Sequence, residues 1–149
     1  MKLAEALQER ADLNRQIEQL RSRLSHNAIV QEGEAPAEDP GDLLAQLDRA
    51  TARLEELMAS INLANSRTVV NDKTLTQIIA RKDCLRLRLE AYRELAETAS
   101  QTARRATRSE IRILSTVDVK TIQAQVDTMA KELRLLDNEL QQTNWTTEL

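Results

Sequence analysis

The chain has 149 residues, of which 41% are hydrophobic and 30% charged, with a formal net charge of -3 at pH 7. Such mixed charge is typical of solvated helix faces and argues against a polyanion or a broadly basic nucleic-acid-binding surface. Aromatic residues make up 1%, and there are two Gly and two Pro. With so few aromatic side chains and turn residues, the composition favours long helices that pack Leu, Ile and Ala in thin layers.

Single copies of cysteine and histidine limit the chemistry of the chain. Cys84 alone excludes an intramolecular disulfide. Together with His26 it supplies too few sulfur and nitrogen ligands for a tetrahedral transition-metal site within one chain. No segment approaches the ~20 apolar residues that span a bilayer, and the N-terminal segment lacks an apolar signal region. We therefore expect a cytoplasmic protein without a membrane segment.

The first predicted helix covers 2–26. Its apolar residues recur at alternating spacings of three and four, as on the face of a coiled-coil helix, with one polar break at Arg10. His26 lies at the C-terminal end, where an imidazole meets the negative end of the helix macrodipole. Capping or plain surface exposure is the favoured interpretation of His26, and a metal ligand or general base is the alternative.

The loop 27–39 follows, and its charge is one-sided. Between Gln31 and Gln46 there are five acidic residues and no basic ones. The acids are Glu32, Glu34, Glu38, Asp39 and Asp42. A solvated loop whose last acids favour the start of the next helix is the simpler interpretation. The alternative is a docking site for a basic partner, or carboxylates that hold Mg²⁺ or Ca²⁺.

The second helix is predicted over 40–65 and the third over 75–105. Asp39 followed by Pro40 is a helix start, and Thr74 with Gln77 forms a capping-box pattern. Both segments carry the same apolar stripe, broken once in the third by Lys82. Such a polar break either fixes the register of helix packing or extends its charged end to solvent.

Two features of the third segment allow alternative interpretations. Cys84 precedes a stripe residue, so a buried, inert thiol is favoured over a reactive one activated by Arg81 and Arg88. Residues 81–112 contain nine basic and five acidic residues. This excess of positive charge could follow an RNA backbone, but the segment has a single aromatic residue, Tyr92, for base stacking. It could equally orient subunits against an acidic loop.

The fourth helix is predicted over 118–143, with Thr116 or Asp118 as its cap. Asn65 and Asn144 are placed where a helix could end in a left-handed residue. The connection 66–73 contains the β-prone triplet that ends at Val70, and 106–117 contains an alternating stretch. A minimal sheet between two such connections is the alternative to irregular loops.

These elements predict an all-α fold in a single domain over 1–149. Four long amphipathic helices form a coiled-coil-like antiparallel bundle, the first helix pairing with the second and the third with the fourth. A minimal β-element from the loops is the one addition that the pattern allows.

Several strings resemble the septicolysin-like family of small, uncharacterised bacterial proteins. They are NAIVQEGEAPAEDP, TRSEIRIL followed by TVDV, KELRLLDNELQ and the ending NWTTEL. The resemblance implies that the loop and the C-terminal strings matter to family members, and it carries over no activity, substrate or cofactor. The family name suggests a membrane-damaging toxin, whereas the narrow stripes and densely charged faces of this chain do not fit membrane insertion.

The resemblance and the local density of polar residues together indicate one candidate ligand site. No catalytic residue is predicted. The candidate ligand-binding residues are Asn27, Gln31, Glu32, Glu34, Arg108, Glu110, Asn144 and Trp145. No cofactor is predicted, with Mg²⁺ or Ca²⁺ at the acidic loop left open.

Apolar residues outside the stripes predict self-association, at least to a dimer. Leu87 lies two residues from both Leu85 and Leu89, about 200° around the helix from each. A second apolar edge on a long helix is a candidate interface. The leading hypothesis is a non-enzymatic, self-associating helical scaffold or interaction protein. The alternatives are a metal- or small-ligand-binding protein or enzyme with a site in 27–39 and, more weakly, an RNA-binding coiled coil.

Overall fold

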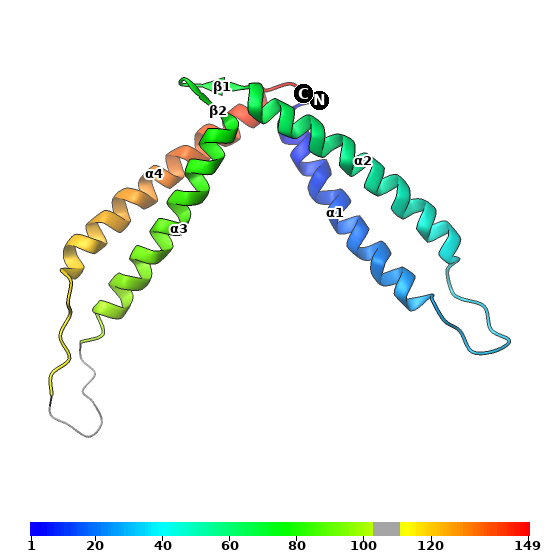
Figure 1. Cartoon of the computed structure of the whole chain (residues 1–149), viewed down its shortest axis with the longest axis horizontal. Coiled ribbons are helices and arrows are strands. Elements are labelled where there is room, and N and C mark those ends of the chain that lie inside the picture. Colours follow the sequence, from blue (N-terminus) through cyan, green and yellow to red (C-terminus); the bar gives the residue numbers. More distant parts are fainter. Residues whose placement is uncertain (103–110) are drawn as a thin grey trace. The chain divides into compact units, whose positions relative to one another are not determined.

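The structure, a computed structural model, describes residues 1–102 and 111–149. Four helices follow one another along the chain, with two short strands between the second and the third (Figure 1). The elements are α1 (Leu3–His26), α2 (Pro40–Arg67), β1 (Val69–Val70), β2 (Lys73–Thr74), α3 (Leu75–Ala99) and α4 (Val119–Thr146). The prediction of an all-α fold with a minimal β-element is confirmed.

The chain forms two compact units by its internal contacts. The first unit comprises Met1–Val69 and Thr143–Leu149, and the second comprises Val70–Gln142. The expectation of a single domain over 1–149 stays a prediction.

In the first unit, α1 and α2 lie side by side and run in opposite directions (Figure 1). Their facing surfaces bury the aliphatic residues of the predicted stripes. The most deeply buried are Leu3, Ala6, Leu20, Leu43, Leu57 and Ile61. Arg53 of α2 pairs with Glu9 of α1, and toward the loop end of the hairpin Arg23 of α1 pairs with Glu38, just before α2. Aliphatic packing therefore joins the helices, and the ion pairs match their antiparallel register.

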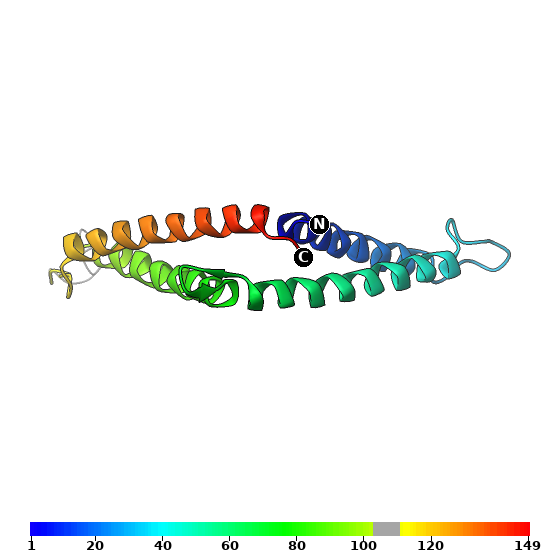
Figure 2. The same ribbon diagram turned by 90° about the horizontal axis from the view of Figure 1, so that it is seen from above.

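The two ends of the chain meet within the first unit (Figure 2). Lys2 and Glu148 form an antiparallel β-bridge. The backbone N–H of Leu3 donates to the carbonyl of Thr147 at 2.9 Å, and that of Leu149 donates to Met1 at 3.0 Å. The Lys2 ammonium also pairs with the Glu148 carboxylate at 2.6 Å. These bonds cover the N-terminal end of α1, where Leu3 is completely buried.

The second unit is held by α3 and α4. Leu85 and Leu89 of α3 pack against Val126 and Met129 of α4, with Tyr92, Ala130, Leu133 and Leu136 around them. Lys82, which interrupts the predicted stripe, places its ammonium on the carboxylate of Asp137 in α4. Its side chain is only 19% exposed. The polar break is therefore filled by an ion pair between the two helices.

The strands β1 and β2 form a β-hairpin with a two-residue turn, and this hairpin connects α2 to α3. Asn71 and Asp72 both have positive φ angles, 50° and 64°. Two consecutive left-handed residues are the geometry of a tight hairpin turn, and Asn and Asp tolerate it best after Gly. The β-prone triplet is thus confirmed in part as a strand, and its partner is the segment that follows. The described residues 111–117 contain no strand.

Three predicted helix starts are confirmed by their side-chain caps. Asp39 accepts from the N–H of Asp42 at 3.2 Å, and Asp118 accepts from the N–H of Lys120 at 3.2 Å. Thr74 and Gln77 form the reciprocal capping box. Each cap satisfies a backbone N–H that has no partner within its own helix.

Three predicted helix ends are wrong. The third helix was expected to reach residue 105 but ends at Ala99, and residues 103–105 lie outside the described part. The Ser100 hydroxyl donates to the carbonyl of Glu97 at 2.8 Å, a local bond that competes with helix continuation. Asn65 and Asn144 lie inside α2 and α4. The backbone N–H groups that follow Asn65 and Asn144 continue the helical hydrogen bonds, so neither helix needs a left-handed residue at these positions. The N–H of Thr68, for example, donates to the carbonyl of Ala64.

Within the described ranges, none of the helices combines the length and the apolar character that a membrane span needs.

We expect Leu57→Ala to lower the free energy of unfolding by about 2–5 kcal/mol, because Leu57 is 2% exposed and truncation leaves a cavity between α1 and α2. Leu63→Ala, on the same helix at 51% exposure, should change it by less than about 0.5 kcal/mol. Chemical denaturation followed by circular dichroism measures both. Equal losses in the two variants would contradict this assignment of the core.

Candidate functional site

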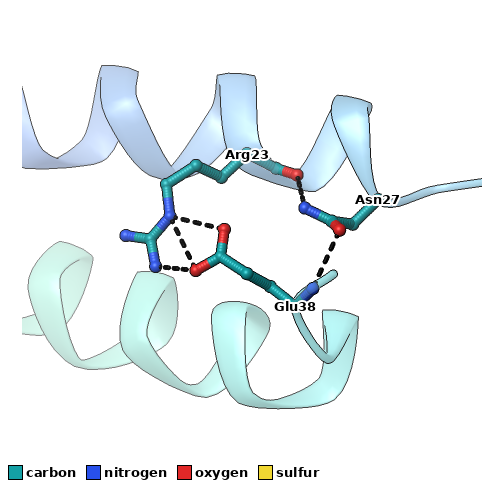
Figure 3. A network of polar contacts seen from close by, with 3 residues as sticks. All are labelled: Arg23, Asn27 and Glu38. Atoms are coloured by element: carbon teal, nitrogen blue, oxygen red, sulfur yellow. Dashed lines mark hydrogen bonds and ion pairs between the residues drawn. The ribbon is translucent and has the colours of Figure 1, made fainter. Parts of the chain in front are cut away.

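The loop 27–39 begins at Asn27, a polar side chain that is only 9% exposed. Its Nδ2 donates to the carbonyl of Arg23 at 2.8 Å, on the last turn of α1. Its Oδ1 accepts from the backbone N–H of Glu38 at 3.0 Å (Figure 3). One amide therefore caps α1 and holds the far end of the loop beside it, which satisfies polar groups that would otherwise be buried without partners.

Glu38 completes this network through its carboxylate. The Nε of Arg23 donates to both carboxylate oxygens, at 3.2 and 2.9 Å, and the Nη2 of Arg23 donates to Oε1 (Figure 3). These hydrogen bonds lower the pKa of Glu38 below its ordinary value and raise the pKa of Arg23. Planar, two-point pairing of this kind fixes geometry as well as charge. The network Arg23–Asn27–Glu38 is thus a closure for the helix hairpin.

The middle of the loop is exposed. Gly33 has a φ of +86°, and the N–H of Glu34 donates to the carbonyl of Gln31 at 3.0 Å, so the chain turns there. Gln31, Glu32 and Glu34 are all exposed, and within the described residues Glu32 and Glu34 form no ion pair. In that same part of the chain, no three His, Cys, Asp or Glu side chains gather into a group that could hold a metal ion.

The remaining predicted site residues do not join this loop. Asn144 and Trp145 belong to the last turn of α4, which adjoins the N-terminal end of α1 through the bond from Leu3 to Thr147. Asn27 lies at the opposite end of α1, and 24 helical residues span about 36 Å. Arg108 and Glu110 fall outside the described residues. The loop and the NWTTEL ending share a resemblance but no common site, and ligand binding by these residues stays a prediction.

His26 is the last residue of α1. Its Nδ1 lies 2.7 Å from the carbonyl of Ser22, and the side chain is exposed. A carbonyl only accepts hydrogen bonds, so this contact requires the proton on Nδ1. The imidazole thereby binds a carbonyl one turn back along α1, at an exposed position.

Cys84 contradicts its prediction. It was expected to be buried and inert, but its side chain is exposed. One helical position is about 100° of rotation. Because Leu85 is buried against α4, the residue before it, Cys84, lies outside that contact.

The chain termini contain a polar group that the sequence did not predict. Glu148 receives hydrogen bonds from the Lys2 ammonium and the N-terminal amine, and these lower the pKa of Glu148 below its ordinary value. The only sequence signal was an opposite pair of charges at the two chain ends, and nothing local relates residues so far apart.

Comparison with known proteins gives two matches without a function. The model of a family described as "Family of unknown function (DUF6847)" matches residues 10–149. The structure is similar to the crystal structure of a functionally unknown conserved protein from Corynebacterium diphtheriae, with a TM-score of 0.94 and 38% sequence identity. That similarity covers 100% of this chain and 98% of the other. No curated protein matches the chain.

We expect Glu38→Gln to destabilise the protein at neutral pH and to lose this effect in acid. The pKa of Glu38 is lowered on folding, so its contribution is present above the ordinary value of 4.5 and is lost as the pH falls through the folded pKa. Denaturation midpoints between neutral pH and about pH 3 should therefore converge for the parent and the variant. Glu34→Gln, at an exposed position in the same loop, is the matched control and should follow the parent at every pH.

Proposed function

Because the chain belongs to the family of unknown function DUF6847, we propose its function from its own surface: a non-enzymatic helical scaffold or interaction protein that associates with itself. The free thiol of Cys84 suits a reducing compartment, so we place the protein in the cytoplasm. In the 27–39 loop, the polar side chains of Asn27 and Glu38 hold the hairpin closed. The exposed helix faces are therefore the surface that we propose for partners.

The observation that carries the proposal is the exposure of Leu87. Its neighbours on either side, Leu85 and Leu89, are 8% and 2% exposed against α4, whereas Leu87 is 67% exposed. A single exposed leucine is ordinary. Here, however, further large aliphatic side chains are at least two-fifths exposed along the helices. They include Leu44, Met58, Leu63, Leu95 and Leu135.

Self-association would bury this surface. The buried core of each helix pair lies between two helices and is mainly aliphatic, since the chain has one Trp, one Tyr and no Phe. Burial of further apolar area contributes roughly 25 cal/mol per Å². A second layer of helices from another copy therefore adds stability that one chain alone does not supply.

We do not propose a membrane-damaging function from the septicolysin-like resemblance. An amphipathic helix that enters a membrane interface typically carries basic residues beside its apolar face. On α3, the exposed face around Leu87 also has exposed carboxylates, Glu90 and Glu94 among them. Such a face suits a protein partner better than an anionic lipid surface.

The alternative function is metal or ligand binding at the acidic loop, and we expect it to fail a direct test. Mg²⁺ and Ca²⁺ should raise the melting temperature of the parent and of Glu32→Gln/Glu34→Gln equally, because these carboxylates stand exposed without a third ligand nearby in the described chain. Differential scanning fluorimetry measures the shift. A stabilisation by Ca²⁺ that disappears in the double variant would support the loop site instead.

We expect the parent protein to form dimers at tens of micromolar in light scattering coupled to size exclusion. Leu87→Glu should move the particle toward the monomer while circular dichroism shows unchanged helicity, because the side chain is exposed within one chain. Leu133→Glu should unfold the α3–α4 pair, since Leu133 packs on its core. A monomeric parent at that concentration would overturn the proposal.

A further inference from the structure

The exposed face of α3 is a continuous apolar stripe, which we call the outer stripe. Its members are Ala80, Cys84, Leu87, Ala91 and Leu95, and all five are exposed. Their spacings of four, three, four and four keep them within about 80° of the helix circumference. The buried face with Ile78, Leu85 and Leu89 is centred about 140° away. α3 is therefore apolar on two nearly opposite sides, and α4 covers only one of them.

The two edges of the outer stripe carry opposite charges. Arg81 and Arg88 follow one edge, and Asp83, Glu90 and Glu94 follow the other. In coiled-coil notation Cys84 and Ala91 occupy a positions, and Ala80 and Leu87 occupy d positions. The arginines are then at e and Asp83 and Glu90 are at g, while Glu94 and Leu95 occupy the next d and e positions, beyond the apolar seam from Ala80 to Ala91. Charges at e and g determine which helices pair and in which direction.

The acidic edge is free to bind a partner. Asp83, Glu90 and Glu94 are exposed and form no ion pair within the described residues. On the basic edge, Arg81 contacts Glu132 of α4, and the Arg88 guanidinium lies 5.3 Å from the centre of the Tyr92 ring. Each guanidinium has five N–H donors, so one such contact leaves donors for a second carboxylate.

We propose, on the basis of the self-association argued above, that the outer stripe packs against the outer stripe of a second copy with the two α3 helices parallel. In a parallel pair, each g edge faces the e edge of the other helix. Asp83 of one copy then meets Arg88 of the other, and twofold symmetry repeats this pair. In an antiparallel pair, equivalent edges face each other, which brings arginine to arginine and carboxylate to carboxylate.

The occupant is a second copy because the charge pattern is complementary to itself. A twofold interface uses the same patch on both subunits, so the patch has to contain both members of each attractive pair. The outer stripe satisfies this condition with one basic and one acidic edge. It is also accessible within the second unit, since α4 packs on the other side of α3.

The parallel arrangement places equivalent a positions beside each other across the twofold axis. Cys84 of one copy therefore faces Cys84 of the other. Their Cα atoms then lie roughly 4.4–6.8 Å apart, the range that a disulfide can bridge. Ala91 has the same relation to Ala91 of the second copy, two helical turns further on. In an antiparallel pair, no more than one of these positions can lie opposite itself.

Disulfide trapping tests the orientation. The parent should give a covalent dimer on mild oxidation through Cys84, and Cys84→Ser/Ala91→Cys should do the same through its new thiol. Cys84→Ser/Arg86→Cys is the matched control, because residue 86 lies well off the outer stripe, and it should stay uncrosslinked. Trapping at only one of the positions 84 and 91, or at neither, in a protein that light scattering shows to be dimeric overturns the parallel pairing and leaves self-association standing.

Charge exchange tests the proposed ion pairs with a second readout. Asp83→Arg should weaken the dimer, by on the order of 5- to 30-fold in dissociation constant, because two attractive pairs become repulsive. Asp83→Arg/Arg88→Asp should restore affinity to near the parent value, whereas Asp42→Arg, in the first unit, should leave it unchanged. Sedimentation measures all of these proteins. An unaltered dissociation constant in Asp83→Arg overturns the pairing, and a parent that never dimerises overturns both this pairing and the proposed function.

Discussion

One line of aliphatic contacts between two helices is the interaction on which both units depend. α1 packs on α2 through residues such as Leu20 and Leu57, and α3 packs on α4 through Leu89 and Met129. Two helices alone enclose little volume, and aliphatic side chains without aromatic partners fill only thin layers. Each unit therefore keeps most of its helix surface in solvent. The charged residues on that surface, and the ion pairs between them, follow from this geometry.

Polar side chains add precision where the aliphatic line ends. Arg23, Asn27 and Glu38 hold the loop end of the α1–α2 hairpin together, and Lys2 with Glu148 joins the two chain termini at the N-terminal end of α1. Lys82 and Asp137 do comparable work between α3 and α4. Exposed ion pairs contribute about 0–1 kcal/mol each, so their main effect is on register and orientation. The apolar layers supply the stability, and the polar contacts select one alignment of the layers.

Features with a local signal could be predicted from the sequence, and those that join distant residues could not. The three- and four-residue spacing of Leu and Ile indicates four helices, and the caps at Asp39, Thr74 and Asp118 mark three starts. Cys84 was misplaced because its distance from the stripe was read along the chain, whereas exposure depends on rotation around the helix. The Lys2–Glu148 bridge links chain ends, and no periodicity carries such a contact. The candidate site joined Asn27 to Trp145 by resemblance, although the length of α1 separates them.

The network at Asn27 also has a topological effect on the segment that it closes. Since the side chain of Asn27 holds the backbone of Glu38, the residues between them form a ring whose ends are already joined. The alignment of α1 and α2 depends on the joined ends of this ring and not on the path of the residues between them. Closing a flexible loop of twice the length costs only about 0.6 kcal/mol more. The exposed stretch around Gly33 can therefore accept an inserted peptide, or even a small folded domain, while α1 and α2 keep their alignment.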